Sequence, residues 1–154
     1  LATSNGLQRY DGSSFITFKP DVSRSDAVPD VKIVLLYIDR HGNLWIMGDN
    51  KRIGIFDTKS FRFREATLRE KRSSLFILQG FFETPSGELL LLKSDGNFLR
   101  YDAKAHTFHP DKDIFPHPPK WKRMWVHWDK HQHKIWMACD SGLGQYEVRT
   151  KNLN

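Results

Sequence analysis

Apolar residues occur along this chain in short runs that are closed by polar or turn-forming residues. The runs are rich in β-branched and aromatic side chains, which is typical of β-strands. Residues 66–72 alone show a helical spacing of apolar positions, and that spacing is weak. The pattern therefore predicts an all-β protein.

The runs belong to a repeat of about 45 residues. Its clearest mark is an aromatic residue followed by an acid, and it recurs at Tyr10, Phe56, Tyr101 and Tyr146, in steps of 46, 45 and 45 residues. A fixed period of this length indicates one supersecondary unit that is used repeatedly. Function is then expected on the surface that the repeated units form together.

Each complete repeat contains four predicted strands. A tight turn joins the first two, with Gly42 and Gly87 available for a positive φ in two of the three repeats. Four short antiparallel strands per repeat are typical of a propeller blade. The predicted strands are 31–38, 43–48, 53–57 and 61–66; 75–83, 88–93, 98–102 and 106–109; and 123–129, 133–139, 143–147 and, weakly, 151–154.

The longest connections between repeats are residues 19–30, 67–74 and 110–122, and they contain most of the prolines. Proline cannot donate to a strand ladder, so it belongs in connectors, and Pro110 is placed there. The first strand of a repeat is nearly continuously apolar, which predicts burial on both of its faces. Later strands are more polar, so we expect each sheet to stand radially with its last strand outermost.

The chain opens within a repeat, because residues 1–10 match 137–146. We therefore expect one partial β-propeller of about three and a half blades, each a four-stranded antiparallel sheet. The expected parts are a part-blade, 1–18, and blades 31–66, 75–109 and 121–154. Closed propellers have ~4–8 blades, so we favour a fragment of a longer protein over copies that complete one another's sheets. The open edges would also promote a homo-oligomer.

Composition excludes several other classes. The chain has no apolar run long enough for a membrane helix, and its first residues lack the pattern of a signal peptide. Its one cysteine, Cys139, cannot form an internal disulfide. The net charge is +6, but Lys and Arg are spread over every repeat rather than concentrated in a stripe. We therefore expect no nucleic-acid partner.

The segments Thr3–Gly12 and Ile38–Ile46, the latter with the sequence Ile-Asp-Arg-His-Gly-Asn-Leu-Trp-Ile, resemble the two-component regulator propeller repeat. The third repeat resembles it in Trp128-Asp129 and in the Ile-Trp-Met-Ala stretch at 135–138. The second repeat departs, with four leucines at 89–92 and Thr84 in place of the acid. The resemblance covers essentially the whole chain.

This resemblance implies a periplasmic sensor of a hybrid two-component system, in bacteria that regulate polysaccharide utilisation. It implies a non-catalytic segment that responds to an oligosaccharide or another small-molecule ligand, without a cofactor. The remaining propeller blades and a histidine kinase would lie outside this chain. A protein-interaction or dimerisation propeller is the alternative. A propeller lyase would need an acid–base cluster aimed at the channel, which repeat spacing cannot establish.

Ligand contacts are expected on loops of the rigid scaffold. The turns between second and third strands, 49–52, 94–96 and 140–142, lie on the same predicted face as the connectors. The segment 120–125 adds flat aromatic surface beside cationic donors, which suits an acidic or neutral sugar, although its tryptophans can equally pack the inner strand. The candidate ligand-binding residues are Asp49, Arg52, Asp95, Lys120, Trp121, Arg123, Trp125 and Asp140.

For other conspicuous residues, the sequence favours a structural role over a binding role. Trp45 and Trp136 lie in mid-strand with apolar neighbours, so we expect them to pack between blades. The acid after each repeated aromatic is expected to accept N–H groups of the following turn. His127, His131 and His133 lie within seven residues of one another. No nearby Cys or Glu completes a set of metal ligands, so no metal is expected.

Overall fold

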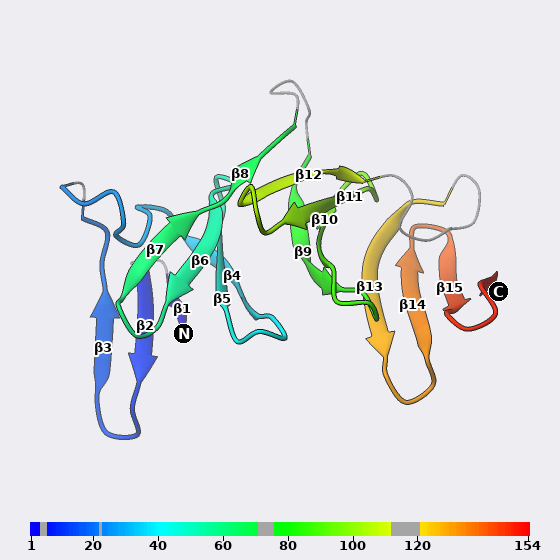
Figure 1. Ribbon diagram of the computed structural model, residues 1–154, viewed down its shortest axis with the longest axis horizontal. Helices are drawn as coiled ribbons and strands as arrows, with labels where there is room; N and C mark the ends of the chain where they lie inside the picture. The colour runs from blue at the N-terminus through cyan, green and yellow to red at the C-terminus, as the bar shows by residue number, and fades with distance from the viewer. Residues whose placement is uncertain (4–5, 22, 71–75, 112–120) are drawn as a thin grey trace. The chain divides into compact units, whose positions relative to one another are not determined.

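The computed structural model describes residues 1–3, 6–21, 23–70, 76–111 and 121–154. All regular structure in these residues is β-strand, which confirms the all-β prediction (Figure 1). The weak helical spacing over 66–72 does not produce a helix in the described residues 66–70, which contain strand β8 (Thr67–Leu68). The Arg69 N–H donates to the Phe108 carbonyl at 2.8 Å, and such pairing outweighs a weak local pattern. The described residues contain no helix that could cross a membrane.

The strands of the described residues form four sheets, one for each expected part of the chain. Consecutive strands within a blade pair antiparallel, and β8 is added beyond β12. In sheet order the strands are β1 (Ala2–Thr3), β2 (Gly6–Tyr10) and β3 (Phe15–Phe18); β4 (Ile33–Ile38), β5 (Leu44–Gly48), β6 (Ile53–Asp57) and β7 (Arg62–Glu65); β9 (Leu78–Glu83), β10 (Leu89–Lys93), β11 (Phe98–Asp102), β12 (Thr107–Asp111) and β8; and β13 (Arg123–Asp129), β14 (Lys134–Cys139), β15 (Gly142–Glu147) and β16 (Asn152–Leu153).

Pro110 lies inside β12, opposite Leu99, so its assignment to a connector was wrong. The Phe108 carbonyl points away from β11, toward Arg69. Since residues two apart in a strand orient their backbone groups alike, the N–H that Pro110 lacks would also point away from β11. The β11–β12 ladder therefore loses no hydrogen bond, and the strand continues to Asp111.

The chain divides into two compact units, Leu1–Thr67 and Leu68–Asn154. Paired residues of an antiparallel ladder point to the same side, so the registers define two faces of each blade. We call the side with the repeated aromatic residue the aromatic face and the other side the opposite face. In blade 31–66, for example, Leu44 pairs with Phe56, which pairs with Phe63, so all three belong to the aromatic face.

Blades pack side by side in the same manner within each unit. In the first unit, Phe56 and Phe63 on the aromatic face of blade 31–66 share a buried cluster with Leu7 of the part-blade, against which Phe18 packs. By the register Leu7↔Phe18, both part-blade residues lie on its opposite face. In the second unit, the aromatic face of blade 121–154 packs on the opposite face of blade 75–109. The buried residues of that cluster are Phe82, Leu90, Leu92, Phe98, Val126, Ile135 and Met137.

The first strand of each complete blade (β4, β9 and β13), which we call the innermost strand, carries a β-bulge that the apolar pattern does not predict. The extra residues are Val34, Gln79 and Met124, which are 45 residues apart, and the partner strand's register shifts at each of them. A bulged residue leaves the ladder and its side chain is re-aimed. Val34 and Met124 are about half exposed, as is Trp125 beside Met124. The expected burial of both faces of these strands is therefore wrong for β4 and β13.

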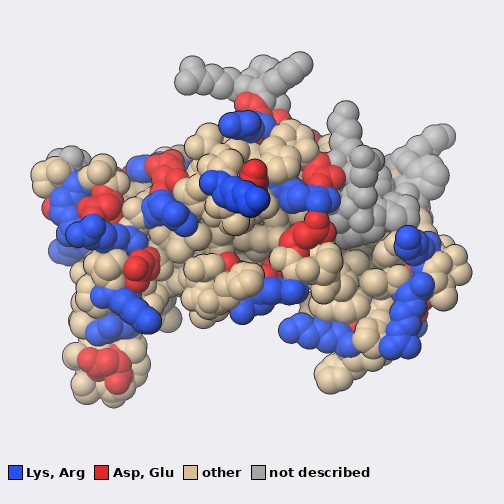
Figure 2. Space-filling view, in the orientation of Figure 1, with Lys and Arg blue, Asp and Glu red and all other residues tan. Residues whose placement is uncertain are grey.

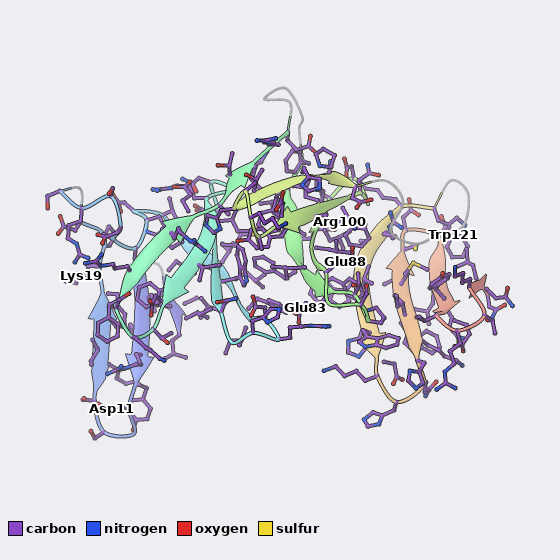
Figure 3. All side chains as sticks on the ribbon, in the orientation of Figure 1. Asp11, Lys19, Glu83, Glu88, Arg100 and Trp121 are labelled. Atoms are coloured by element: carbon purple, nitrogen blue, oxygen red, sulfur yellow. The ribbon has the colours of Figure 1, made fainter. Side chains whose placement is uncertain are left out.

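Three of the four expected carboxylates close their turns by accepting two N–H groups each, whereas Glu147 accepts the Arg149 N–H at a long 3.5 Å. Asp11 at the β2–β3 turn, labelled in Figure 3, accepts the N–H groups of Ser13 and Ser14, both at 2.9 Å. Asp57 and Asp102 accept two turn N–H groups each in the same way. These hydrogen bonds lower the pKa of all three carboxyl groups, because they stabilise the ionised form.

The Asp-x-x-Gly-Asn-x-Trp motif has a direct explanation in the first hairpin of blade 31–66. The buried Asp39 carboxylate accepts the His41 and Asn43 N–H groups, the Asn43 side-chain amide and the Trp45 indole N–H, all at 2.8–2.9 Å. In the second repeat, Thr84 replaces the acid and its hydroxyl accepts the Glu88 N–H at 3.0 Å. The departure from the motif thus keeps the turn but not the contact to a tryptophan.

Candidate functional site

The turns between second and third strands, where four candidate residues lie, share one backbone hydrogen bond in every complete blade. The first residue after the second strand donates its N–H to the carbonyl of a residue that enters the innermost strand. These turns therefore hold the entry of the innermost strand in place. The pairs are Asp49 with Lys32 at 3.0 Å, Ser94 with Ile77 at 2.7 Å, and Asp140 with Lys122 at 3.0 Å.

The side chains of Asp140 and Ser94 each accept a second hydrogen bond, from the backbone N–H of the same partner residue. The Asp140 carboxylate accepts the Lys122 N–H at 3.0 Å, and the Ser94 hydroxyl accepts the Ile77 N–H at 2.9 Å. The Lys122 N–H is the largest cause of the lowered pKa of Asp140. The carboxylate of Asp140 is therefore engaged in the fold, although both Asp140 and Asp49 are exposed.

Arg52 and Asp95 form ion pairs within their own blades. The Arg52 guanidinium holds Glu65 through Nε at 3.0 Å and Nη2 at 2.5 Å. The Asp95 carboxylate accepts the Asn97 N–H and lies 3.2 Å from the Lys93 ammonium.

Lys93 is a buried cation, since its side chain is 7% exposed. Its Nζ lies 2.6 Å from the Glu70 carboxylate, 3.2 Å from Asp95 and 4.9 Å from the centre of the Phe76 ring. Burial acts to lower the pKa of Lys93, but hydrogen bonds to the two carboxylates outweigh it, so the pKa is raised. Asp95 thus helps to compensate a buried charge.

The candidate segment 120–125 separates into different environments. Arg123 is buried, with Nε donating to the Gly96 carbonyl at 2.8 Å and the guanidinium 4.8 Å from the Phe98 ring centre. Burial lowers the pKa of this guanidinium. Trp121, labelled in Figure 3, lies over Gly142, where a Cβ would come 3.0 Å from the indole. Lys120 lies outside the described residues.

Trp125 keeps the most open surface of this segment, at 53% exposed. The edge of its ring lies 3.2 Å from the position that a Cβ on Gly80 would occupy, so it rests on the neighbouring innermost strand β9. Met124 in β13 and Ile77, which directly precedes β9, are also exposed apolar residues. In the amide orientation that satisfies both of its neighbours, Gln79 donates to the Met124 and Lys93 carbonyls, at 3.2 and 3.1 Å.

The first unit contains a pocket of about 930 Å³ beside the connector 19–30. Its aromatic side is the pair Phe18 and Phe61, whose ring centres are 4.9 Å apart. Its polar lining includes Lys19, labelled in Figure 3, together with Arg24 and Asp30. Sequence analysis singled out the connector by its length but none of these residues. We call this cavity the connector pocket.

The connector is tied to blade 31–66 and braced internally. The Phe63 N–H donates to the Asp26 carbonyl at 2.7 Å, and the Asp26 carboxylate lies 3.0 Å from Arg24 and 3.3 Å from Arg62. The hydrogen bond and charge of Asp26 raise the pKa of Arg24. Arg24 is therefore held beside the pocket by its ion pair with Asp26.

The remaining observations concern metal binding and charged side chains. The described part of the chain has no group of three or more His, Cys, Asp or Glu side chains that could hold a metal ion. On blade 75–109, Arg100 pairs with both Glu88 and Asp111 (Glu88 and Arg100 are labelled in Figure 3). On the face shown in Figure 2, Lys and Arg lie interspersed with Asp and Glu, as the sequence indicated.

No protein-family model matches the chain, and no curated protein matches it. Solved structures do resemble it. The extracellular domains of two hybrid two-component systems of B. thetaiotaomicron align with 99% of the chain, at TM-scores of 0.66 and 0.64 and identities of 16% and 17%. Virginiamycin B lyase from Staphylococcus aureus aligns with 98% of it, at a TM-score of 0.62 and 16% identity.

The chain spans 21% and 22% of the two sensor domains and 48% of the lyase. The fold is thus that of a β-propeller segment, which confirms the predicted fold class. The resemblance to the two-component regulator propeller repeat is likewise confirmed at the level of the fold, since extracellular domains of such systems share it over almost the whole chain.

Proposed function

We propose that this chain is a non-catalytic, ligand-sensing segment of the extracytoplasmic part of a hybrid two-component sensor kinase. The observation that carries the proposal is the shared fold over 99% of the chain with two extracellular domains of such systems. The repeat motif around Asp39 and Trp45 supports the same class. The histidine kinase and the remaining blades would belong to the parent protein, and the location would be the periplasm.

The ligand that we propose is an oligosaccharide or a related glycan fragment, bound in the connector pocket. Its volume of about 930 Å³ lies in the range of small-molecule sites. Phe18 and Phe61 offer apolar ring surface for the C–H side of a sugar, and Lys19 and Arg24 offer donors to hydroxyl or carboxylate oxygens. Arg24 is already oriented by Asp26, which lowers the entropic cost of using it.

Further candidate contacts under this proposal are Trp121 and the exposed surface at Trp125 in the second unit and, separately, Asp49 in the first unit; Lys120 stays a candidate from the sequence alone. The side chains of Arg52, Asp95, Arg123 and Asp140 are engaged in the contacts described above, so they would support these loops rather than bind the ligand. A bound ligand would bias the arrangement of the parent receptor only by as much as it prefers one arrangement.

Titration calorimetry with a panel of neutral and acidic oligosaccharides tests the proposal. Saturable binding that is weakened about tenfold by Arg24→Ala and left unchanged by Trp125→Ala supports the connector pocket. The reverse pattern places the ligand at Trp125. Absence of binding to every glycan, in a parent receptor whose kinase activity also ignores them, would refute glycan sensing.

The lyase likeness makes turnover the natural control experiment. We expect no turnover of virginiamycin B by the chain, since a shared fold does not by itself carry a shared chemistry. Turnover that His127→Ala abolishes would replace the sensor proposal with an enzymatic one. Stable capture of a protein partner irrespective of glycan would favour the scaffold alternative.

A further inference from the structure

The charges around the connector pocket are balanced. Its described lining contains two cationic side chains, Lys19 and Arg24, and two carboxylates, Asp21 and Asp30. Asp21 accepts the Ser23 hydroxyl at 2.6 Å and the Ser23 N–H at 2.9 Å, and these bonds lower its pKa. The Asp21 carboxylate is therefore ionised at neutral pH. Since the opposite charges of the lining cancel, the pocket offers no net positive field to an acidic ligand.

The charge of Arg24 is compensated within the protein. Its Nε lies 3.0 Å from the Asp26 carboxylate, which also lies 3.3 Å from Arg62. The hydrogen bond from Arg24 is the largest cause of the lowered pKa of Asp26, so this carboxylate is ionised too. An acidic sugar would have to displace Asp26 from Arg24, or place its own carboxylate beside those of Asp21 and Asp30. Both arrangements are unfavourable, because like charges would meet or an existing ion pair would be lost.

The side chains of Lys19 and Asp30 remain available to a ligand. Both residues are exposed, and within the described part of the chain no hydrogen bond or ion pair engages either side chain. An ammonium group donates hydrogen bonds and a carboxylate accepts them, while a sugar hydroxyl can do both. The two side chains together therefore suit an uncharged ligand that is rich in hydroxyl groups.

Phe61 contributes an aromatic ring to the pocket from a strained backbone position. Its φ is 59°, in the left-handed region that bulky residues rarely adopt. His106 and Lys151 occupy the same turn position in their blades with φ of 52° and 56°, so the conformation belongs to the repeat. Asn or Gly would adopt it with less strain. Backbone strain of this kind is found where side chains clamp ligands, and the Phe61 ring is 38% exposed.

We propose that the connector pocket takes an uncharged sugar unit rather than an acidic one. The C–H face of the sugar would lie on the Phe61 ring, and its hydroxyls would bond to the Lys19 ammonium and the Asp30 carboxylate. Arg24 would donate to a further hydroxyl while Asp26 continues to balance its charge. This inference rests on the proposed function, because it narrows the ligand from glycans in general to neutral ones.

Titration calorimetry at low salt tests the charge argument. Neutral gluco-, manno- and galacto-oligosaccharides are compared with oligomers of glucuronic, mannuronic and galacturonic acid of equal length. We expect the neutral oligomer that binds best to bind at least tenfold more tightly than its acidic counterpart. Asp30→Asn should narrow this difference, because it removes a negative charge from the lining. Asp11→Asn is the matched control, since Asp11 lies at the other end of β3 from Lys19 (Figure 3), and it should leave the difference unchanged.

The outcomes separate this inference from the proposed function. Equal or tighter binding of an acidic oligomer, weakened by Arg24→Ala, would overturn the preference for neutral sugars and leave glycan sensing in place. A difference that Asp30→Asn does not change would refute the role of the lining charges. Absence of binding to both classes of oligomer would contradict the proposed function as well.

Phe61→Asn separates a binding role of the ring from a packing role. We expect this variant to bind the neutral oligomer at least tenfold more weakly, with a melting temperature that is unchanged or raised, because Asn suits the left-handed turn position. Lys151→Asn changes the same turn position in blade 121–154 and should leave binding unchanged. If the Phe61 ring served only to pack on Phe18, the variant would lose thermal stability and keep its affinity. Either of these two results would overturn the proposal.

Discussion

Lys122 and Asp140 are joined by two reciprocal hydrogen bonds, although 18 residues separate them in the chain. The Asp140 carboxylate accepts the Lys122 N–H, and the Asp140 N–H donates to the Lys122 carbonyl, both at 3.0 Å. The pair fixes the point at which the connector becomes strand β13. Since the backbone bond recurs in all three complete blades, it belongs to the repeat rather than to a ligand site.

We expect Asp140→Ala to lower the melting temperature by a few degrees, because the Lys122 N–H loses its acceptor. Asp140→Asn should have a smaller effect, since an amide oxygen can still accept the same bond. Thermal unfolding followed by circular dichroism measures both. Equal effects of the two substitutions would show that the charge, not the hydrogen bond, matters.

Asp39→Ala should destabilise the protein by about 2–3 kcal/mol, because it leaves the buried Trp45 indole N–H and two turn N–H groups without their acceptor. Urea unfolding gives the free energy. Asp11→Ala is the matched comparison, since Asp11 also accepts two turn N–H groups while lying exposed on the surface. The Asp11 variant should lose clearly less stability, and an equal loss would remove the special role of Trp45.

Stability should fall below about pH 4. Hydrogen bonds lower the pKa of Asp11, Asp57 and Asp102, each from an ordinary value of 3.8. A carboxyl group with a lower pKa in the folded state stabilises that state above its unfolded pKa. The contribution disappears as the pH falls through the folded pKa. Urea midpoints should therefore stay level from pH 7 to 5 and then decline.

Asp57→Asn should make the decline of the urea midpoint at low pH less steep, because one of the contributing carboxyl groups no longer titrates. Burial raises the pKa of Asp39, but hydrogen bonds from Asn43 and Trp45 outweigh it and lower the pKa. Asp39 therefore contributes to the same loss of stability at low pH. A loss of stability centred between pH 6 and 7 would instead point to histidines and contradict this account.

Gly54→Ala should destabilise the fold by about 1–3 kcal/mol through overpacking. A Cβ on Gly54 would come 2.3 Å from the Arg64 carbonyl oxygen and 2.6 Å from the Phe63 ring. Gly144 holds the same place in its repeat, two residues before the aromatic, yet its nearest neighbour would be a methionine methyl at 3.5 Å. Gly144→Ala should therefore be tolerated, and similar urea midpoints for both variants would contradict the packing argument.

The candidate ligand residues show that local sequence patterns do not predict which side chains are available to a ligand. Arg123 follows a tryptophan and two lysines in sequence, which suggested a binding loop, but its guanidinium is buried against Gly96 and Phe98. Conversely, Phe61 and Arg24 are far apart in sequence and gave no signal, yet they line one pocket. Which side chains meet across a blade boundary depends on packing, and local spacing does not record it.

The sequence by itself determined the repeat, the four strands of each blade and the acids of the turns, because these depend on local hydrogen bonding and on periodicity. The tertiary structure alone decided the bulges at Val34, Gln79 and Met124, the burial of Arg123 and the pocket that Arg24 and Phe61 line. These features join residues that are distant in the chain, and such long-range contacts are set only when the sheets pack.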